Sequence, residues 1–424
     1  MNAPQGWNTG TLHEVAHITM GQSPDSKYYS EEEIGLPFLQ GCAEFQARFP
    51  LPRLYCSNSK KIAKQGAILF SVRAPVGRQN IAERDYVIGR GLAAIQGKQV
   101  AQPYLEHFLA SETPNFSTAS QGSTFEAINS TELASWPVIY PDDHAEQSKI
   151  AEVLSKVDSA IAQTEALIAK QQRIKTGLMQ DLLTRGIDEH GQVRTEASHA
   201  FKDSPLGRIP VEWDVMEIDQ LVSRVGSGVT PTGGESVYTA DGILFLRSQN
   251  VHFDGLRLDD VAYIPSHIHH SMMRSEVVEN DVLLNITGAS IGRCCRMPKI
   301  NIHANTNQHV CTIRLRDVDE ARAGFLAAVL QSHIGQHQIG QLNAGGNREG
   351  LNYQQVRSFH VPWPSDRSEF VRIYDQIKRM NAVVAHHSVS LDKLRHLKTA
   401  LMQDLLTGKV RVTHLLLQIE AASA

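Results

Sequence analysis

The chain has 424 residues, of which 42% are hydrophobic and 20% are charged, a composition typical of a globular protein with two or three domains. It contains no apolar run of the roughly 18 residues that a membrane-spanning helix requires, and its first residues lack a signal-sequence pattern, so we expect a cytoplasmic protein. Five cysteines without a C-x-x-C pair argue against a disulfide framework.

Two parts of the sequence are strongly basic, although the net charge of the chain is −4. Residues 48–98 contain ten Lys or Arg and two acidic residues, a local charge of +8. Residues 282–316 contain five Lys or Arg and no acidic residue. Because a solvated surface usually mixes both signs, these clusters predict contact with the phosphates of a nucleic acid.

The sequence predicts six successive segments. They are a globule at residues 1–141, a long helix at 142–186, a polar linker at 187–210, a second globule at 211–364, a second long helix at 365–411 and a tail at 412–424 that we leave unassigned. Both globules consist of short β-type runs separated by Gly, Pro and Asn, which is typical of mixed α/β domains. The predicted fold class is α+β, with two such domains alternating with two long helices.

Each predicted long helix carries one apolar stripe, with residues spaced three, four or seven apart. In the first helix the stripe contains Ile150, Leu154, Val157, Ile161, Ile168, Ile174, Leu178 and Leu182. In the second helix it contains the corresponding residues Ile373, Ile377, Met380, Val384, Leu391, Leu397, Leu401 and Leu405. One such stripe usually marks a helix packed on its own domain. Two matched stripes favour packing of the helices on each other, as a coiled coil.

The two helices are copies of one sequence. The chain contains KTGLMQDLLT from Lys175 and KTALMQDLLT from Lys398, and nine of these ten residues are identical. Both copies begin with the pattern of a capping box, an Asp followed three residues later by a Glu, and both end near a glycine suited to a C-cap. These residues are Asp143 with Glu146, Asp366 with Glu369, Gly186 and Gly408.

The repeat extends into the globules. The segment ILFSVRAPVGR, which ends at Arg78, corresponds to VLLNITGASIGR, which ends at Arg293. The segment GSTFEAIN from Gly122 corresponds to GGNREGLN from Gly345. Variable globules on a constant pair of helices indicate that the globules recognise a ligand and that the helices position them.

Motifs for catalysis are absent from the sequence. It has no P-loop, no H-E-x-x-H, no G-x-S-x-G and no Pro-Pro dipeptide, which removes the (N/D)-P-P-aromatic motif of amino-methyltransferases. Cysteines and histidines gather between residues 294 and 311, but their spacing matches no standard zinc pattern. We therefore expect no catalytic residue and no bound metal.

The globules offer side chains suited to recognising bases. Arg can bond guanine, and Asn or Gln can bond adenine, in the major groove of DNA. Polar loop residues of this kind occur at corresponding places in both globules, although each one taken singly could have a purely structural role. The candidates are Arg73, Arg78, Gln79, Asn80, Thr124, Arg247, Gln249, Asn250, Thr287, Ser290, Arg293, Asn347 and Arg348.

With these features, the chain resembles the DNA-specificity (S) subunit of type I restriction–modification systems. The resemblance runs from Trp7 to about Val412, and its most specific parts are GLMQDLLTRG, ALMQDLLTGK, the linker FKDSPLGRIPVEW and NITGASIGR. It implies two target-recognition domains, each recognising one half of a split asymmetric site in double-stranded DNA. It also implies an antiparallel pair of spacer helices with pseudo-two-fold symmetry.

The resemblance further implies partners that carry the chemistry. Two methyltransferase subunits would bind S-adenosylmethionine and methylate adenine at N6, and restriction or translocase subunits, where present, would use ATP and Mg. This chain itself would bind no cofactor. The alternative is a coiled-coil adaptor that assembles proteins without recognising DNA, but an adaptor has no need for a charge of +8 over residues 48–98.

Overall fold

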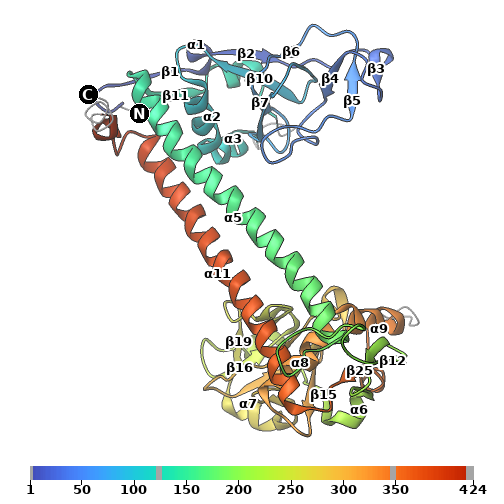
Figure 1. Cartoon of the computed structure of the whole chain (residues 1–424). Coiled ribbons are helices and arrows are strands. Elements are labelled where there is room, and N and C mark those ends of the chain that lie inside the picture. Colours follow the sequence, from blue (N-terminus) through green and yellow to red (C-terminus); the bar gives the residue numbers. More distant parts are fainter. Residues whose placement is uncertain (1–2, 121–126, 344–349, 417–424) are drawn as a thin grey trace. The chain divides into compact units, whose positions relative to one another are not determined.

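A computed structural model describes residues 3–120, 127–343 and 350–416 (Figure 1). The chain divides into two compact units, one formed by residues 1–165 and 389–424 and the other by residues 166–388. We call them the first and the second unit. The mixed α/β character expected from the sequence is confirmed in both. Among the described residues, no helix is long and apolar enough to cross a membrane.

The described residues of the first unit form three sheets. A two-stranded sheet pairs β1 (Trp7–Thr11) with β11 (Pro137–Pro141). A four-stranded antiparallel sheet has the order β2 (Ala16–Met20), β10 (Leu92–Gly97), β7 (Ile68–Ser71) and β8 (Gln79–Ile81). A five-stranded sheet has the order β3 (Tyr29–Ser30), β5 (Leu54–Cys56), β4 (Leu36–Leu39), β9 (Tyr86–Ile88) and β6 (Ile62–Ala63).

Short helices cover the sheets of the first unit. They are α1 (Leu12–Val15), η1 (Ser26–Tyr28), α2 (Gln102–Ser111), α3 (Thr113–Ser120) and α4 (Ser130–Ala134). The main core joins Phe70 and Ile95 of the sheet to Leu105 of α2 and, from the long helices, to Ile150 and Leu405. The globule and the adjoining helix segments therefore share one core, and burial of these apolar side chains stabilises both together.

The second unit contains corresponding sheets. One pairs β14 (Asp214–Glu217) with β25 (His360–Trp363). A four-stranded sheet has the order β15 (Val222–Ser227), β24 (Val310–Leu315), β21 (Val282–Asn285) and β22 (Cys294–Arg296). Another has the order β19 (Ala262–Ile264), β16 (Ile243–Leu246), β23 (Ala304–Thr306) and β20 (Glu276–Val277). Two hairpins pair β12 (Phe201–Ser204) with β13 (Gly207–Pro210) and β17 (Val251–His252) with β18 (Gly255–Leu256).

Helices of the second unit pack on these sheets. They are α6 (Ile218–Leu221), η2 (Gly234–Val237), η3 (Ser248–Asn250), α7 (Ser266–Ser271), η4 (Met273–Ser275), η5 (Gly288–Ser290), α8 (Glu320–Gln331), α9 (His333–Asn343) and α10 (Tyr353–Arg357). The main core joins Phe325 of α8 to Leu182 near the end of one long helix and to Ile373 near the start of the other. The second unit is thus built on the same plan as the first.

Strand order shows this shared plan directly. The order β2-β10-β7-β8 in the first unit matches β15-β24-β21-β22 in the second. Among the strands that the structure describes, each unit also has one parallel pair, β4 with β9 and β16 with β23, and the other pairs are antiparallel. The sequence repeat found in the globules is therefore also a repeat of topology.

The two long helices are α5 (His144–Thr184) and α11 (Arg367–Leu405). Asp143 caps α5 by accepting a 2.8 Å hydrogen bond from the backbone N–H of Ala145, and Asp366 caps α11 by accepting one of 2.9 Å from Ser368. The predicted stripe residues are buried or half-buried, with two exceptions. Ile174 and the corresponding Leu397 are about half exposed, so the predicted stripe is wrong at this position in both helices.

The second half of each predicted capping box is wrong. Glu146 and Glu369 are buried, and their carboxylates bind arginines rather than the cap residue. Arg411 donates to Glu146 over 2.7 and 2.6 Å, and Arg194 forms a two-point pair with Glu369. In each unit a buried Glu at the start of one long helix thus binds an Arg that follows the end of the other.

Candidate nucleic-acid interface

In the first unit, four loops are held together by backbone hydrogen bonds at one edge of the sheets. Gly21 N–H donates to the carbonyl of Leu92, Gly89 N–H to Leu39, Val72 N–H to Gly91, and Ser71 N–H to Arg78. A Cβ at Gly21 would overlap the backbone carbonyl of Gly89, so this close approach requires glycine. We call the resulting group of loops (residues 21–24, 39–41, 72–78 and 89–91) the first loop cluster.

The first loop cluster presents cationic and amide side chains to solvent. Arg73, Arg78, Arg90 and Gln40 are all exposed. Ser23 and Gln40 are bonded to each other over 2.9 Å, and the Ser23 hydroxyl also accepts the Arg90 backbone N–H. Arginine and glutamine on a framework of fixed loops are suited to binding phosphates and base edges.

In the second unit, Asn285 ties two loops together. Its side chain, fully buried, donates to the carbonyl of Ser248 over 2.8 Å and to the hydroxyl of Ser290 over 3.1 Å. A second polar chain runs from Thr230 to Gln308, from Gln308 to His309 (3.2 Å) and from His309 to Thr287 (2.6 Å). We call the loops at residues 228–232, 247–250, 286–293 and 307–309 the second loop cluster.

Corresponding backbone hydrogen bonds hold both clusters. The bond from Gly89 to Leu39 matches the one from Asn307 to Leu246, the bond from Val72 to Gly91 matches Ile286 to His309, and the bond from Ser71 to Arg78 matches Asn285 to Arg293. These matches place the side chains of the two clusters in pairs: Arg78 with Arg293, Gln40 with Arg247, and Arg90 with Gln308. The backbone hydrogen bonds of the two clusters therefore correspond, but at two of these three pairs of positions the residue type differs between the units.

The first loop cluster and the sheets that carry it lie in a part of the chain that matches a known protein family. Residues 4–172 match the family model of the type I restriction modification DNA specificity domain. Over these residues the chain is similar to that specificity domain, and the resemblance seen in the sequence is confirmed. The specificity domain match covers the first unit's globule and much of α5.

Individual relatives agree with this assignment. The chain is 36% identical over 185 residues to a putative type I restriction enzyme MjaX specificity subunit of Methanocaldococcus jannaschii, covering 43% of each chain. It is 23% identical over 273 residues to the MjaVIII specificity subunit of the same organism, covering 64% of this chain and 61% of that one. Each alignment thus spans less than two thirds of the curated relative.

The fold of the whole chain matches a solved specificity subunit. The crystal structure of the type I restriction–modification S subunit from M. genitalium aligns with a TM-score of 0.61 over 96% of this chain and 98% of that chain, at 11% identity. At this identity the match shows the fold alone. The second unit, outside the matched specificity domain, therefore also has the fold of a specificity subunit.

Two predicted base-contacting residues have structural roles in this specificity-subunit fold. Asn80 and Asn250 are buried, with 3% and 1% of their surface exposed. Asn80 bonds backbone groups of Gln46, and Asn250 donates to the carbonyls of Arg257 and Asp260 over 3.0 and 2.8 Å. The prediction is corrected for both, because neither side chain retains a polar group facing solvent.

Of the other predicted residues, seven lie in the loop clusters. Arg73, Arg78, Thr287, Ser290 and Arg293 lie in the loop clusters described above. Arg247 and Gln249 also lie there, but both contact Asp260, at 3.5 and 2.6 Å, so the acid holds them in place. Gln79 is half-buried at the start of β8. Thr124, Asn347 and Arg348 lie outside the described residues.

The basic segments of the sequence serve partly to stabilise the fold. Arg314 binds the fully buried carboxylate of Asp281 over two distances of 2.7 Å, and Arg296 binds Asn280 over 2.8 Å and Glu320 over 3.1 Å. These two arginines of residues 282–316 are therefore not free for phosphate contact. Sequence reasoning missed Gln40, Arg90, Thr230, Gln308 and His309, which the loop framework brings beside the predicted residues.

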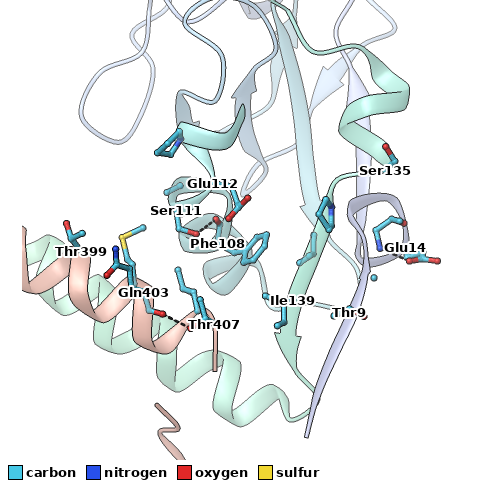
Figure 2. A pocket seen from close by; sticks show the side chains of 18 residues that line it. Thr9, Glu14, Phe108, Ser111, Glu112, Ser135, Ile139, Thr399, Gln403 and Thr407 are labelled. Atoms are coloured by element: carbon cyan, nitrogen blue, oxygen red, sulfur yellow. Dashed lines mark hydrogen bonds between the residues drawn. The ribbon is translucent and has the colours of Figure 1, made fainter. Parts of the chain in front are cut away.

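A cavity of about 830 Å³ lies in the first unit between α11 and the sheet β1–β11. Figure 2 shows Thr399 and Gln403 of α11, with Thr407 just after its end, on one side of it, and Phe108, Ser111 and Ile139 of the globule on the other. Met402 of α11 and Leu406, just after its end, complete this side of the cavity. All five residues belong to the repeated KTALMQDLLT segment, and their counterparts in α5 are identical.

The cysteines near residue 300 are core residues, as the sequence indicated. Cys294, Cys295 and Cys311 are buried as free thiols in the strands β22 and β24. Burial raises the pKa of Cys295 and of Cys311 to about 12, because the apolar surroundings disfavour the thiolate. A thiol held neutral in this way is neither a nucleophile nor a metal ligand.

Proposed function

We propose that this chain is a non-catalytic subunit that recognises a bipartite, asymmetric site in double-stranded DNA and directs adenine-N6 methyltransferase subunits to it. Each unit would recognise one half-site through its loop cluster.

One observation carries the proposal: the two loop clusters share a backbone framework but differ in their side chains. Gln40 and Arg90 in the first unit stand where Arg247 and Gln308 stand in the second. Amide and guanidinium groups bond different base edges, so the same framework would recognise two different half-sequences. An adaptor without DNA has no need for such clusters, nor for the exposed Arg73, Arg78 and Arg90.

We further propose that α5 and α11 form an antiparallel coiled coil that spaces the two recognition units with pseudo-two-fold symmetry. In the first unit, Asp158 of α5 pairs with Lys398 of α11 at 2.6 Å, and Glu165 pairs with Arg395 at 2.7 Å. The residue number rises along α5 where it falls along α11, which supports antiparallel packing.

Partner subunits would dock on the repeated helix face. The lining of the cavity combines apolar side chains, among them Phe108, Met402 and Leu406, with exposed polar groups such as Gln403. Because the same helix residues occur in both copies, we propose two methyltransferase subunits per chain. S-adenosylmethionine would bind to these partners, and ATP and Mg to a restriction or translocase subunit where one is present.

Methylation mapping tests this function. The chain would be co-expressed with the methyltransferase subunit from the same source, and methylated adenines would be mapped over a genome that lacks other adenine methylation. We expect one bipartite motif, and no methylation by either protein alone. Methyl transfer by the isolated chain, or methylation without a sequence motif, would contradict the proposal.

The docking surface is tested by stoichiometry. Gln403→Arg and Gln180→Arg each place a large cation in one copy of the repeated face, where both glutamines are exposed. Native mass spectrometry should show two methyltransferase subunits on the wild-type chain, one on each single variant and none on the double variant. Gln172→Arg, an exposed residue of α5 outside the repeated segment, is the matched control and should keep both partners.

A further inference from the structure

We propose that the second unit binds one divalent transition-metal ion, with zinc as the best fit, through His269, Glu276 and His303. One ligand atom from each residue lies within 4.8 Å of those of the other two. The residues come from three separate places, α7, β20 and the segment that leads into β23. Two imidazoles and one carboxylate with an open fourth position form a common ligand set for zinc.

His269 is held in the orientation and tautomer that a metal ligand requires. Its Nδ1 lies 2.7 Å from Oδ1 of Asn305. The amide of Asn305 cannot be turned around, because its nitrogen donates to the carbonyl of Met272 over 3.0 Å and to the hydroxyl of Ser275 over 2.8 Å. Nδ1 of His269 must therefore carry the proton, which leaves a lone pair on Nε2.

The other two proposed ligands, Glu276 and His303, contact each other. Nδ1 of His303 lies 2.7 Å from a carboxylate oxygen of Glu276, and the rings of His269 and His303 have centroids 5.2 Å apart. The His303 side chain is 67% exposed, so an ion could enter from solvent and displace the proton between these two groups. Arg224 and Arg314 also approach Glu276, but they donate to its backbone carbonyl, and Arg314 is paired with Asp281.

The first unit shows that the fold does not require polar groups here. Strand register places Glu276 opposite Asn305 in the second unit and Ile62 opposite Val87 at the corresponding position in the first. His303, two residues before Asn305, corresponds in the same way to Asp85. An apolar pair thus fills the place that Glu276 and Asn305 occupy, and a buried polar network is costly unless it has a use.

A bound ion would join α7 to the edge of the sheet β19-β16-β23-β20. The segment that follows, Met272 to Ser275, lines a hollow of about 590 Å³ together with Thr230 of the second loop cluster. The ion would therefore hold in place the segment Met272 to Ser275, which lines this hollow in the second unit. The first unit, with Ile62 and Val87 at the corresponding position, would bind no ion. This predicts one ion per chain, whether or not the chain recognises DNA.

Metal binding to the full chain, purified without a histidine tag, tests the site. The chain has 19 histidines, so specificity must come from variants. We expect one tight site in titrations with zinc, and with cobalt a d–d absorption band of four-coordinate geometry. His303→Ala should weaken binding more than about 100-fold, beyond the range for loss of an outer-shell partner. Because His303 is exposed, this variant should remain folded.

His270→Ala is the matched control, since His270 is an exposed neighbour of His269 and is not one of the three ligands. It should bind zinc and cobalt like the wild type. His303→Cys should restore cobalt binding and add a thiolate charge-transfer band near the site. Zinc should raise the melting temperature of the wild type and of His270→Ala, but not of His303→Ala. Absence of a tight site, or equal affinity in wild type and His303→Ala, would overturn the proposal.

Discussion

Arg411 binds the buried carboxylate of Glu146 with two nitrogens, at 2.7 and 2.6 Å, although the residues are 265 positions apart. The side chain of Glu146 has no exposed surface. The pair joins the start of α5 to the segment that follows α11, and Arg194 and Glu369 make the equivalent pair in the second unit. Trp213 adds a 3.1 Å hydrogen bond to Glu369.

We expect Arg411→Ala to lower the free energy of unfolding by about 3 kcal/mol, because it leaves the buried carboxylate of Glu146 without its partner. Arg395→Ala is the control, since the pair of Arg395 with Glu165 is about half exposed on both sides and should contribute less than about 1 kcal/mol. Urea denaturation of both variants measures the difference. Equal losses would show that the buried pair has no special role.

Gly186 should resist substitution, whereas Gly177 should tolerate it. Gly186 has φ +68°, and a Cβ there would overlap the Glu369 carboxylate and the Trp213 ring. Gly177 lies within α5, has open space around it and corresponds to Ala400 in the other copy. Gly177→Ala should stabilise the chain by roughly 0.5–1 kcal/mol, and Gly186→Ala should destabilise it by more than about 1 kcal/mol. Thermal unfolding of the two variants decides this, and a stabilising Gly186→Ala would contradict the fold described.

Stability should fall at alkaline pH. Burial raises the pKa of Cys295 and Cys311 from the ordinary value of 9.0 to about 12, so the unfolded chain releases these protons first. The stabilisation is fully present below pH 9 and is progressively lost as pH rises toward about 12. Urea midpoints measured between pH 8 and 11 should show this decline, and a Cys295→Ala/Cys311→Ala variant should show a smaller slope. If the urea midpoints of the variant and the wild type fall equally steeply with pH, ionisable groups other than these two cysteines cause the decline.

Features that depend on the spacing of nearby residues could be predicted from the sequence. The apolar stripes from Ile150 and Ile373 mark the buried faces of α5 and α11, and the repeat of Arg78 and Arg293 marks equivalent loop positions. The hydrogen-bond and ion-pair partners of polar residues come from distant segments of the chain. The spacing of residues in the sequence does not predict these long-range contacts. For this reason the sequence pattern predicts that Glu146 and Glu369 cap the helices, whereas each binds an arginine from a distant segment.

The same limit applies to the candidate DNA-binding residues. Asn80 and Asn250 have the right chemistry for bases, but the loops fold so that their amides bind backbone groups instead. Conversely, Gln40 and Gln308 carry no sequence signal. They become candidates only because backbone hydrogen bonds align the loops around Leu39 and Leu246.

If α5 and α11 space the half-sites, lengthening both should widen the gap between them. Seven residues inserted after Lys170, with seven after Ala385 in α11, keep the heptad phase and add about 10 Å, equal to about three base pairs. Methylation mapping should then show the same two half-sequences with a longer spacer. Altered half-sequences with an unchanged spacer would show that the helices do not set the spacing. Insertion of five residues at the same places, which rotates the stripe, should instead reduce stability.

The most direct test of the central claim compares Arg78→Ala with Arg293→Ala in the methylation assay. If each loop cluster recognises its own half-site, each variant should relax the sequence preference in one half only, and the two variants should affect different halves. A base contact should cost roughly 1–3 kcal/mol in binding at one position, whereas a phosphate contact should weaken binding evenly and reduce its salt dependence. Arg53→Ala, an exposed arginine of the same basic segment outside the cluster, should leave the motif unchanged. Unchanged motifs and affinity in both variants, or a change in both halves from either one, would contradict the account.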